Sequence, residues 1–462
     1  MKKYSEEQKA TIIVVIITAF VTTFTGSALN LSIPTMGKEF HVSASLIGWV
    51  VTAYMLAVAA LSVPFGRLAD ITRRKKILVL GIFVFSLSSL ASAFAWNFWI
   101  ILLLRIVQGM GGAMIFSTNT AVLVSAFPEN ERGKALGYSV ASTYVGLSLG
   151  PVVGGLLNHY FGWRSIFILT FIISGMVCYT AIKKLPRGDK NQDKITLDIS
   201  GIILYVCMIV AVMYGFSSFS TSKLAAFFIG GGLILGVCFV RHELKIEKPI
   251  VGIRLFTGNI AYAFSNIAAL LNYGATFAIG YLLSIYLQVV MGFSSQIAGL
   301  ILIAQPVVMA ALSPFAGRLS DKISPYKLAS FGMGLCAAGI LFFVFISEKY
   351  PLWLIITALV VTGVGFAFFS SPNTNAIMSC VEEKDYGVAS SLLATMRSIG
   401  HTSSMAIVTL IVGMYMGNTV LTEAEPAVLV RTMHTAFIVF TIICLAGIFI
   451  SAKRKLKKEN SK

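Results

Sequence analysis

The chain has 462 residues, of which 57% are hydrophobic and only 12% are charged, and its mean hydropathy is +0.85. A composition this apolar excludes a soluble fold, because the long charge-free runs could not all be buried in one core. The formal net charge of +17 would suit a nucleic acid or another polyanion, so the positions of the basic residues decide what the charge means.

Apolar runs long enough to cross a membrane recur along the whole chain. A membrane-spanning helix needs roughly 20 such residues, and the sequence predicts about fourteen of these helices. The predicted spans cover residues 10–33, 46–65, 77–95, 98–123, 135–157, 165–183, 199–219, 224–240, 260–289, 296–315, 328–347, 352–378, 388–415 and 433–452. The predicted fold class is therefore an all-α membrane protein.

The basic residues are concentrated in alternate connections between these spans. One side of the membrane receives 29 of the Lys and Arg residues, and the other receives five, namely Lys38, Arg164, Lys223, Lys349 and Arg431. Cytoplasmic loops carry such an excess, so we expect a multi-pass protein of the cell (inner, cytoplasmic) membrane with both termini in the cytoplasm. The charge then reports topology and not a nucleic-acid partner, and the basic tail 453–458 is expected to touch anionic lipid headgroups.

Two motifs of this chain occur twice. The segment Gly66–Asp70 returns as Gly317–Asp321, 251 residues later. One helix further along, Gly109–Gly111 returns as Gly363–Gly365 after 254 residues. We therefore expect a parallel repeat of two six-helix bundles, which is the architecture of transporters that open alternately to the two sides of a membrane.

The repeat also predicts the domain boundaries. An N-terminal six-helix bundle is expected over residues 1–184, and a C-terminal six-helix bundle with a basic cytoplasmic tail over residues 258–462. Residues 185–257 between them are expected to hold a charged linker and two additional helices, the first of which begins with Asp198 as its cap.

Several motifs resemble those of a known family, and their order along the chain makes the match specific. They are Gly66–Lys75, Arg105–Ala113, Gly146–Gly155, Phe161–Phe167 and Glu247–Phe256. On these residues the chain resembles the major facilitator superfamily and, within it, the fourteen-helix drug:proton antiporters, which include multidrug and tetracycline exporters. The resemblance covers nearly the whole chain.

The first of these motifs is expected to form a cytoplasmic turn. Gly66 would allow a tight turn at the membrane surface, and Asp70 would lie near the start of the third helix, paired with Arg73 or Arg74. The resemblance implies that this loop is a conformational latch that breaks in every transport cycle, with Asp321 as a weaker second copy. The alternative is that its charges only fix the topology.

The fifth predicted helix carries a glycine stripe. Gly146, Gly150 and Gly154 recur every four residues and share one face, and Pro151 bends the helix. Together with Gly155, this antiporter motif is expected to make a close contact between the two bundles that seals the pore on one side. The alternative is that the stripe serves helix packing alone.

Arg105 lies inside the fourth predicted helix and is the most costly residue of the chain to insert. An Arg at the centre of a membrane helix costs ~2.5–3.5 kcal/mol on insertion scales, so it should face water or a partner. The resemblance implies that Arg105, with Gln108 of the same motif, handles protons or substrate. Snorkelling of Arg105 to the membrane surface is the alternative.

The chain departs from the family where related exporters carry an acidic residue in the first helix. Alignment on Asn30 and Pro34 puts Thr25 at that position, and all 19 Asp and Glu residues fall in loops or at helix ends. His401, one turn after Arg397 and on the same face, is then the candidate proton carrier, because histidine titrates near neutral pH. Alternatively, His401 only hydrogen-bonds a neighbouring helix. The missing acid favours neutral or anionic substrates over cations.

Further polar residues inside predicted helices could line a central cavity, and each could instead make a hydrogen bond between helices. They are Asn30, Trp49, Tyr54, Asn119, Asn272, Gln288, Gln305 and Asn373. Of these, we assign Asn30, Asn119 and Asn373 to the predicted proton or substrate pathway.

Together, these patterns predict a secondary transporter that exports small amphiphilic, drug-like molecules in exchange for protons by alternating access. Its expected partners are the small-molecule substrate, protons and membrane lipid, and we expect it to act as a monomer. A specific transporter of an anionic metabolite is the main alternative. An enzyme is not expected, because the sequence carries no nucleophile–base set, Walker loop, metal-ligand spacing or cofactor motif. A membrane sensor would need a further soluble domain.

Overall fold

The computed structural model describes residues 5–127, 129–185, 198–218, 224–246, 250, 256, 258–381, 386–417, 419, 421 and 424–452. Only the backbone is described at positions 70, 71, 124, 129–137, 140, 141, 217, 321, 386–388, 390 and 391. Within this part of the chain the regular structure is helical and no strand occurs. The helices are α1 (Glu6–Asn30), α2 (Ile33–Phe40), α3 (Ala44–Ile47), α4 (Trp49–Ile71), α5 (Arg74–Ala93), α6 (Phe98–Ser125), α7 (Glu129–Phe161), α8 (Arg164–Lys184), α9 (Ile199–Ser217), α10 (Ala225–Lys245), α12 (Ile260–Thr276), α13 (Ile279–Ile285), the π-helix η1 (Tyr286–Val290), α14 (Ser295–Leu302), α15 (Ala304–Lys322), α16 (Pro325–Val344), α17 (Leu352–Met378), α18 (Tyr386–Met416) and α19 (Pro426–Ala452).

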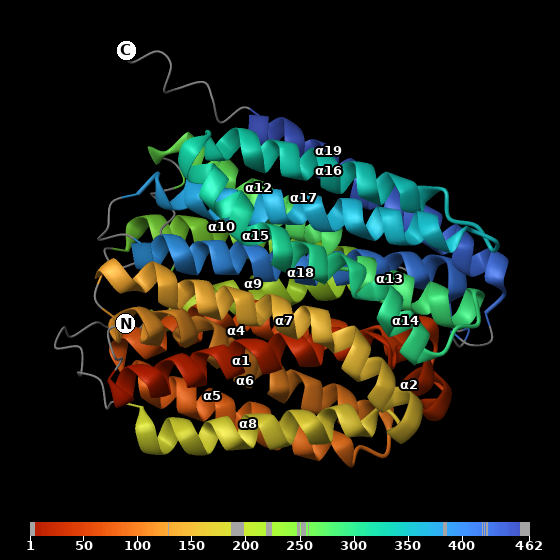
Figure 1. Ribbon diagram of the computed structural model, residues 1–462, viewed down its shortest axis with the longest axis horizontal. Helices are drawn as coiled ribbons and strands as arrows, with labels where there is room; N and C mark the ends of the chain where they lie inside the picture. The colour runs from red at the N-terminus through yellow and green to blue at the C-terminus, as the bar shows by residue number, and fades with distance from the viewer. Residues whose placement is uncertain are drawn as a thin grey trace.

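Thirteen helical segments of the described chain are long and apolar enough to cross a membrane. Some of them join neighbouring elements, as Ile260–Val290 joins α12, α13 and η1. Helix α7 is 33 residues long and runs beside them, but it is not one of the thirteen (Figure 1). The all-helical membrane fold is thus confirmed, while the count of fourteen stays a prediction.

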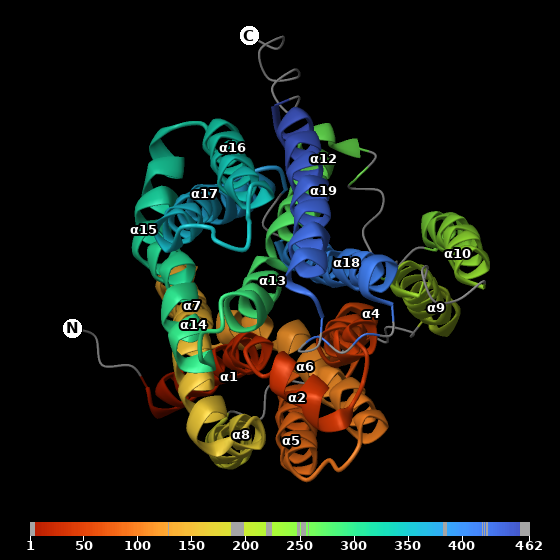
Figure 2. The ribbon, with the colours of Figure 1, turned by 90° about the vertical axis from the view of Figure 1, so that its right-hand side faces the viewer.

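The helices lie side by side along one direction, and both chain termini emerge at the same end of the molecule (Figure 1). We call this the terminal end, and the other end, where α2 lies and α14 begins, the opposite end. Seen along the helices, α1, α5, α6 and α8 gather on one side and α12, α16, α17 and α19 on the other (Figure 2). We call α1–α8 the N-terminal bundle and α12–α19 the C-terminal bundle.

The two bundles repeat the same close helix contacts. A Cβ atom at Gly109 of α6 would lie 2.7 Å from the Tyr54 carbonyl oxygen of α4. One at Gly363 of α17 would lie 2.7 Å from the Gln305 carbonyl oxygen of α15. Only glycine fits at such distances, so the backbones of each helix pair touch. The two Gly-x-Gly motifs therefore serve helix packing at equivalent places in both bundles.

The first motif does not form the predicted turn. Gly66 and Asp70 lie near the end of α4, which continues to Ile71, and the chain turns at Thr72 and Arg73. Asp70 is therefore at the C-terminal end of one helix and not at the start of the next. The predicted position at the start of the next helix is therefore wrong, while the contacts of the Asp70 side chain lie outside the described residues.

Close packing explains why both copies of this motif stay helical. The second copy, Gly317–Asp321, lies inside α15, which ends one residue later. A Cβ atom at Gly66 would lie 3.5 Å from Ser117 Cβ of α6, and one at Gly317 would lie 2.9 Å from Ser371 Oγ of α17. A glycine inside a helix costs only about 0.5–1 kcal/mol, and a small residue lets the neighbouring helix approach.

Helices α9 and α10 stand beside α4 and α18, to one side of the two bundles (Figure 2). Tyr205 of α9 donates a hydrogen bond to the Ala59 carbonyl of α4 at 3.0 Å. Ser403 of α18 in turn lies 3.8 Å from the sulfur of Met213 of α9. The additional helix pair therefore contacts the N-terminal and the C-terminal bundle at once.

Asp198 caps α9 as predicted, because its side chain accepts a hydrogen bond from the Gly201 N–H at 3.0 Å. It also lies 2.9 Å from His242 Nε2 near the end of α10, which ties the two additional helices together. Most of the predicted linker after Lys184, most of the motif Glu247–Phe256 and the basic tail 453–458 lie outside the described residues.

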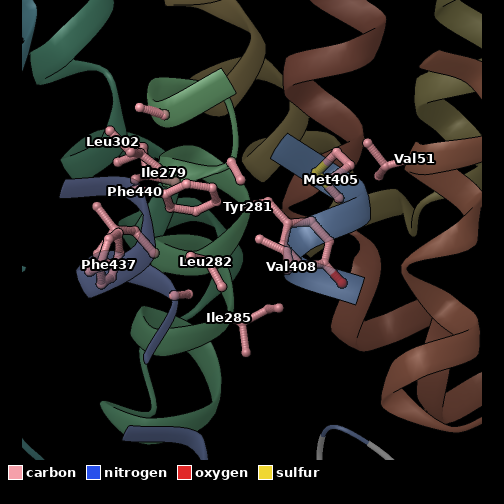
Figure 3. Packing of buried hydrophobic residues seen from close by; sticks show 14 of the residues in the cluster. Val51, Ile279, Tyr281, Leu282, Ile285, Leu302, Met405, Val408, Phe437 and Phe440 are labelled. Carbon is pink, nitrogen blue, oxygen red and sulfur yellow. The ribbon is translucent and has the colours of Figure 1, made fainter. Parts of the chain in front are cut away.

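The largest apolar cluster contains side chains of both bundles. Figure 3 shows part of it, with Val51 of α4, Tyr281 of α13, and Met405 and Val408 of α18. All four are 2% exposed or less. Apolar burial therefore helps to hold the two bundles together in the half of the molecule nearer the opposite end.

Candidate functional site

Helix α7 of the N-terminal bundle and α14 of the C-terminal bundle touch backbone to backbone. A Cβ atom at Gly299 would lie 2.0 Å from the Pro151 carbonyl oxygen, and one at Gly155 would lie 2.4 Å from the Ser295 carbonyl oxygen. Ser295 Oγ also donates to the Gly155 carbonyl at 3.1 Å. Pro151 and Gly155 therefore take part in a contact between the bundles, as the sequence predicts, and it lies near the opposite end.

The glycine stripe of α7 faces a different neighbour. Cβ atoms at Gly146, Gly150 and Gly154 would lie 2.3, 2.6 and 2.5 Å from side-chain atoms of α1, which belong to Thr23, Ser27 and Ala28. Because α1 is in the same bundle, the expectation that the stripe joins the two bundles is wrong. Residues four apart share one face of a helix, and Pro151 and Gly155, each one residue further, are turned by about 100° towards the other bundle.

Further hydrogen bonds join the bundles in the same half of the molecule. Ser284 of α13 donates to the Asn30 carbonyl at the end of α1 at 2.9 Å. The hydroxyls of Thr52 in α4 and Thr409 in α18 are 3.5 Å apart. Asn30 thus joins the interface through its backbone, whereas its side-chain Oδ1 is buried without a hydrogen-bond partner.

Near the middle of α7, three hydroxyl groups from both bundles converge. Tyr144 of α7 donates to Ser370 Oγ of α17 at 3.3 Å. The Tyr273 hydroxyl of α12 lies 3.1 Å from the same Ser370 oxygen. All three residues are buried, so this small network links the bundles in the interior of the molecule.

Arg397 and His401 of α18 adjoin this network, one helical turn apart. Arg397 Cζ lies 5.0 Å from the centre of the Tyr273 ring. The His401 ring is stacked on Phe277 with 4.3 Å between ring centres, and it stands edge-on to Tyr273 at 5.3 Å. These contacts define what we call the central cluster: Tyr144, Tyr273, Phe277, Ser370, Arg397 and His401.

Arg105 of α6 is only 1% exposed and lies inside the N-terminal bundle, so it does not snorkel. Its Nε donates to the Val50 carbonyl of α4 at 2.9 Å, and its Nη1 donates to Gln108 Oε1. Gln108 Nε2 donates in turn to Ser89 Oγ of α5 at 2.7 Å. The guanidinium also lies over the Tyr54 ring, 4.3 Å from its centre. Arg105 and Gln108 therefore tie three helices of one bundle together.

Asn119 and Asn373 hold equivalent positions in the two bundles. Asn119 Nδ2 donates to the Val15 carbonyl of α1 at 3.3 Å, and Asn373 Nδ2 donates to the Ser265 carbonyl of α12 at 3.2 Å. Each thus makes a hydrogen bond between helices, which is the alternative to lining a cavity.

Thr25 is the residue at the position where the family resemblance implies an acidic side chain. Its hydroxyl donates to the Val21 carbonyl and lies 3.0 Å from the Thr170 hydroxyl of α8. Both threonines are buried. At this position the N-terminal bundle therefore holds a pair of neutral hydroxyl groups.

The predicted latch residues lie at the terminal end. Arg73 precedes α5 and Arg74 begins it, and both side chains are exposed. The side chains of Asp70 and Asp321 lie outside the described residues, so their pairing stays a prediction. No group of three or more His, Cys, Asp and Glu residues that could hold a metal ion occurs in the part of the chain that the structure describes.

Several residues of the central cluster were not predicted from the sequence: Tyr144, Tyr273, Phe277 and Ser370. Each is one of many aromatic or hydroxyl residues in apolar helices, and no motif marks it. The spacing of Arg397 and His401 was the available signal for the cluster, because residues four apart lie on the same face of a helix and contact the same neighbours.

Comparison with known proteins identifies the family. The family model of the Major Facilitator Superfamily matches residues 15–241 and 266–462. The riboflavin transporter RibZ of Clostridioides difficile is 31% identical over 84% of this chain and 84% of its own length. The multidrug resistance protein Stp of Mycobacterium tuberculosis is 26% identical over 87% of this chain and 75% of its own length.

A solved structure shares the fold. It is the crystal structure of a bacterial homologue of the human lysosomal transporter Spinster, in an inward-facing and unoccupied conformation, with a TM-score of 0.68, 14% identity and 98% coverage of both chains. The predicted resemblance to the superfamily and to its drug exporters is thus confirmed. The chain belongs to the Major Facilitator Superfamily and is a multi-pass membrane transporter.

Proposed function

We propose that this transporter exports small amphiphilic, drug-like molecules in exchange for protons, by alternating access between two six-helix bundles. The observation that carries the proposal is the contact between the bundles at the opposite end, where Gly155 and Gly299 let two backbones touch. Alternating access needs such a contact between packed units, made in one arrangement and broken in the other. The similarity to the multidrug resistance protein Stp supports a drug-like substrate.

In this proposal the chain crosses the cell membrane fourteen times, with α7 added to the thirteen apolar segments. Its units are residues 1–184, 185–257 and 258–462, and it acts as a monomer. The terminal end faces the cytoplasm, because the loops at that end hold most of the Lys and Arg residues. The contact between α7 and α14 is then a closed external gate.

Asp70, with Arg73 and Arg74, forms the proposed latch at the cytoplasmic end. Exposed charges stabilise a contact only weakly, by about 0–1 kcal/mol, which suits a contact that must break in each cycle. Asp321 is the weaker copy, because fewer basic residues follow it.

His401 is the proposed proton carrier, since no other side chain of the central cluster changes its charge near neutral pH. It lies in contact with Tyr273, which hydrogen-bonds Ser370 and so adjoins the link to Tyr144 of the other bundle. A proton on His401 is therefore placed where it can bias the arrangement of the two bundles. Arg105 and Gln108 form the alternative proton pathway.

A transporter for one specific metabolite, aromatic or anionic, is the second candidate. The 31% identical relative is a riboflavin transporter, and riboflavin contains a flat aromatic ring system. The central cluster offers aromatic rings and the positive charge of Arg397, with no described carboxylate paired to it.

Everted membrane vesicles from an efflux-deficient host test both candidates. Uptake of cationic, neutral and anionic compounds, including riboflavin, is measured with an acidic vesicle interior and again after the proton gradient is collapsed. We expect several compounds to accumulate, and the accumulation to disappear with the gradient and in vesicles without this protein. Saturable uptake of one metabolite alone would favour the specific metabolite transporter. Accumulation that does not depend on the proton gradient would reject proton exchange.

Single variants in the same vesicles assign the roles. Asp70→Asn should slow uptake at unchanged expression, and Asp321→Asn should slow it less. His401→Gln keeps hydrogen bonding but cannot titrate, so its uptake should no longer follow the gradient. Normal coupling in His401→Gln would exclude His401 as the carrier, and equal, normal rates in both aspartate variants would remove the latch.

A further inference from the structure

The central cluster contains a positive charge without a described negative partner. Arg397 is the twelfth residue of the 31-residue helix α18, so it lies well inside the helix. Among the described residues, no carboxylate pairs with Arg397 and its guanidinium makes no hydrogen bond. Its Nε is buried without a partner. The guanidinium therefore keeps N–H donors for a ligand.

Two other arginines of the described chain use donors within the protein. Arg105 donates to the Val50 carbonyl and to Gln108, while its Nη2 is buried without a partner, and Arg164 pairs with Glu39 at 2.7 Å. Both of them are thus engaged inside the N-terminal bundle. A polar group with a buried, unsatisfied donor costs free energy that a ligand carbonyl or carboxylate would recover on binding.

The surroundings of Arg397 are aromatic and held in place. Tyr273 packs edge-on against Phe366 and Phe369, with ring centres 5.3 and 6.4 Å apart. Tyr273 is 5% exposed, whereas Phe277 and His401 are partly exposed. The buried rings thus fix the position of the cluster, and the stacked Phe277 and His401 rings leave aromatic surface open to a ligand.

Both bundles contribute to the cluster. Tyr144 comes from the N-terminal bundle, while Ser370, Tyr273 and Arg397 come from the C-terminal bundle. A ligand that binds among these groups touches both bundles, so its binding free energy can differ between the two arrangements. Such a difference is what couples binding to a conformational change.

We propose that the central cluster binds flat aromatic molecules that are neutral or negatively charged, and that Arg397 is the residue that selects against cations. The inference rests on the proposed transport function and names its substrate class. The rings supply faces for stacking, and the guanidinium attracts anionic substituents and π-systems. A cation would meet an unpaired positive charge at the same place.

Three acridine probes with one ring framework test the inference: 9-acridinecarboxylate (an anion), acridone (neutral) and proflavine (a cation at neutral pH). Their saturable binding to the purified full-length protein in detergent is measured by fluorescence, with heat-unfolded protein as the blank. We expect 9-acridinecarboxylate to bind about tenfold more tightly than proflavine, with acridone between them. Arg397→Gln should remove this order, and Arg397→Lys should keep the preference for the anion.

Arg431 provides the matched control, since its Cζ also lies over a tyrosine ring, 5.5 Å from the centre of Tyr415, but outside the central cluster. Arg431→Gln should leave all three affinities unchanged. Equal or tighter binding of proflavine to the parent protein would overturn the inference, and so would an unchanged order in Arg397→Gln or no saturable binding of any probe. Selective binding without transport in vesicles would instead reject the proposed function alone.

Discussion

Arg105 and Arg397 both lie well inside a helix, and they meet the cost of leaving water in different ways. Arg105 donates from Nε to Val50 and from Nη1 to Gln108 and rests on the Tyr54 ring, while its Nη2 is buried without a partner. Arg397 rests on a tyrosine ring as well, but its donors have no described partners. A buried charge that uses several donors within the protein mainly stabilises structure, whereas one without a described hydrogen bond can respond to a ligand. The geometry therefore separates a structural arginine from a ligand-binding one.

At the residue scale, Arg105→Lys is expected to destabilise the N-terminal bundle. A lysine ammonium lacks the planar fork that reaches Val50 and Gln108 at the same time, so one acceptor loses its partner. Leaving a buried acceptor unsatisfied costs about 1–3 kcal/mol. The midpoint of thermal unfolding of the detergent-solubilised protein should fall by several degrees, and transport should fall with it.

Ser89→Ala is the control for this prediction, because it removes only the far end of the same hydrogen-bond chain, from Gln108 Nε2. Its effect should be smaller, about 1 kcal/mol. If Arg105→Lys melts at or above the temperature of Ser89→Ala, Arg105 is not the residue that ties α4, α5 and α6 together.

At the scale of single helices, α7 shows how one motif serves two contacts. Its residues 146, 150 and 154 fix α7 to α1 within the bundle, while residues 151 and 155 meet α14 across the interface. The first contact has to persist through the transport cycle, whereas the second has to break. A substitution on one face should therefore affect stability, and a substitution on the other should affect the balance of conformations.

Gly299→Ala tests the second of these contacts. The added Cβ would lie 2.0 Å from the Pro151 carbonyl oxygen, a backbone atom that cannot move aside, so α14 must separate from α7. Overpacking of this kind costs about 1–3 kcal/mol, which should raise the open population by roughly five- to 150-fold. Labelling of the buried Ser284→Cys by a membrane-impermeant maleimide, in a variant without the six native cysteines, should accelerate accordingly.

Two other Gly→Ala changes control for the substitution itself. A Cβ at Gly334 has nothing within 4 Å, so Gly334→Ala should change neither labelling nor stability. A Cβ at Gly154 would lie 2.5 Å from Ala28 Cβ, so Gly154→Ala should lower the unfolding midpoint without faster labelling. If labelling in Gly299→Ala matches that in Gly334→Ala, the contact between α7 and α14 is not the gate.

The sequence predicted the helices better than it predicted which helices contact one another. Apolar runs and repeated motifs were enough to predict the all-helical membrane fold. A segment in lipid must satisfy its own backbone hydrogen bonds, and a helix does so. Periodicity shows which residues share a face, but the neighbour that receives this face depends on the packing of distant helices. For this reason the stripe with Gly150 was assigned to the wrong contact. Gly66 was assigned to a turn because its close neighbour Ser117 is not visible in the sequence.

At the scale of the whole molecule, close contacts within each bundle differ from the contacts between parts that rearrange. Glycine-mediated backbone contacts recur in both bundles at equivalent places, so each bundle should behave as a rigid body. The additional helix α9 is hydrogen-bonded to α4 through Tyr205, whereas it meets α18 through the weaker contact of Met213 with Ser403. We therefore expect α9 to move with the N-terminal bundle when the two bundles rearrange.

The last prediction tests this rigid-body motion with two pairs of threonines. Thr52 and Thr409 face each other across the interface, with 3.5 Å between their hydroxyls. In a variant without native cysteines, the pair Thr52→Cys and Thr409→Cys should form a disulfide on mild oxidation, because side chains this close suit its geometry. Vesicle transport should stop when the link forms and return after reduction, since the bundles must separate there in each cycle.

The control pair is Thr25 and Thr170, whose hydroxyls are 3.0 Å apart within the N-terminal bundle. A disulfide between Thr25→Cys and Thr170→Cys joins two helices that move together, so transport should continue after oxidation. Mass spectrometry confirms that each link has formed. Continued transport with Thr52→Cys linked to Thr409→Cys would mean that this interface does not open. A stop with the Thr25→Cys and Thr170→Cys link would mean that the N-terminal bundle itself deforms during transport, because a rigid bundle tolerates an internal cross-link.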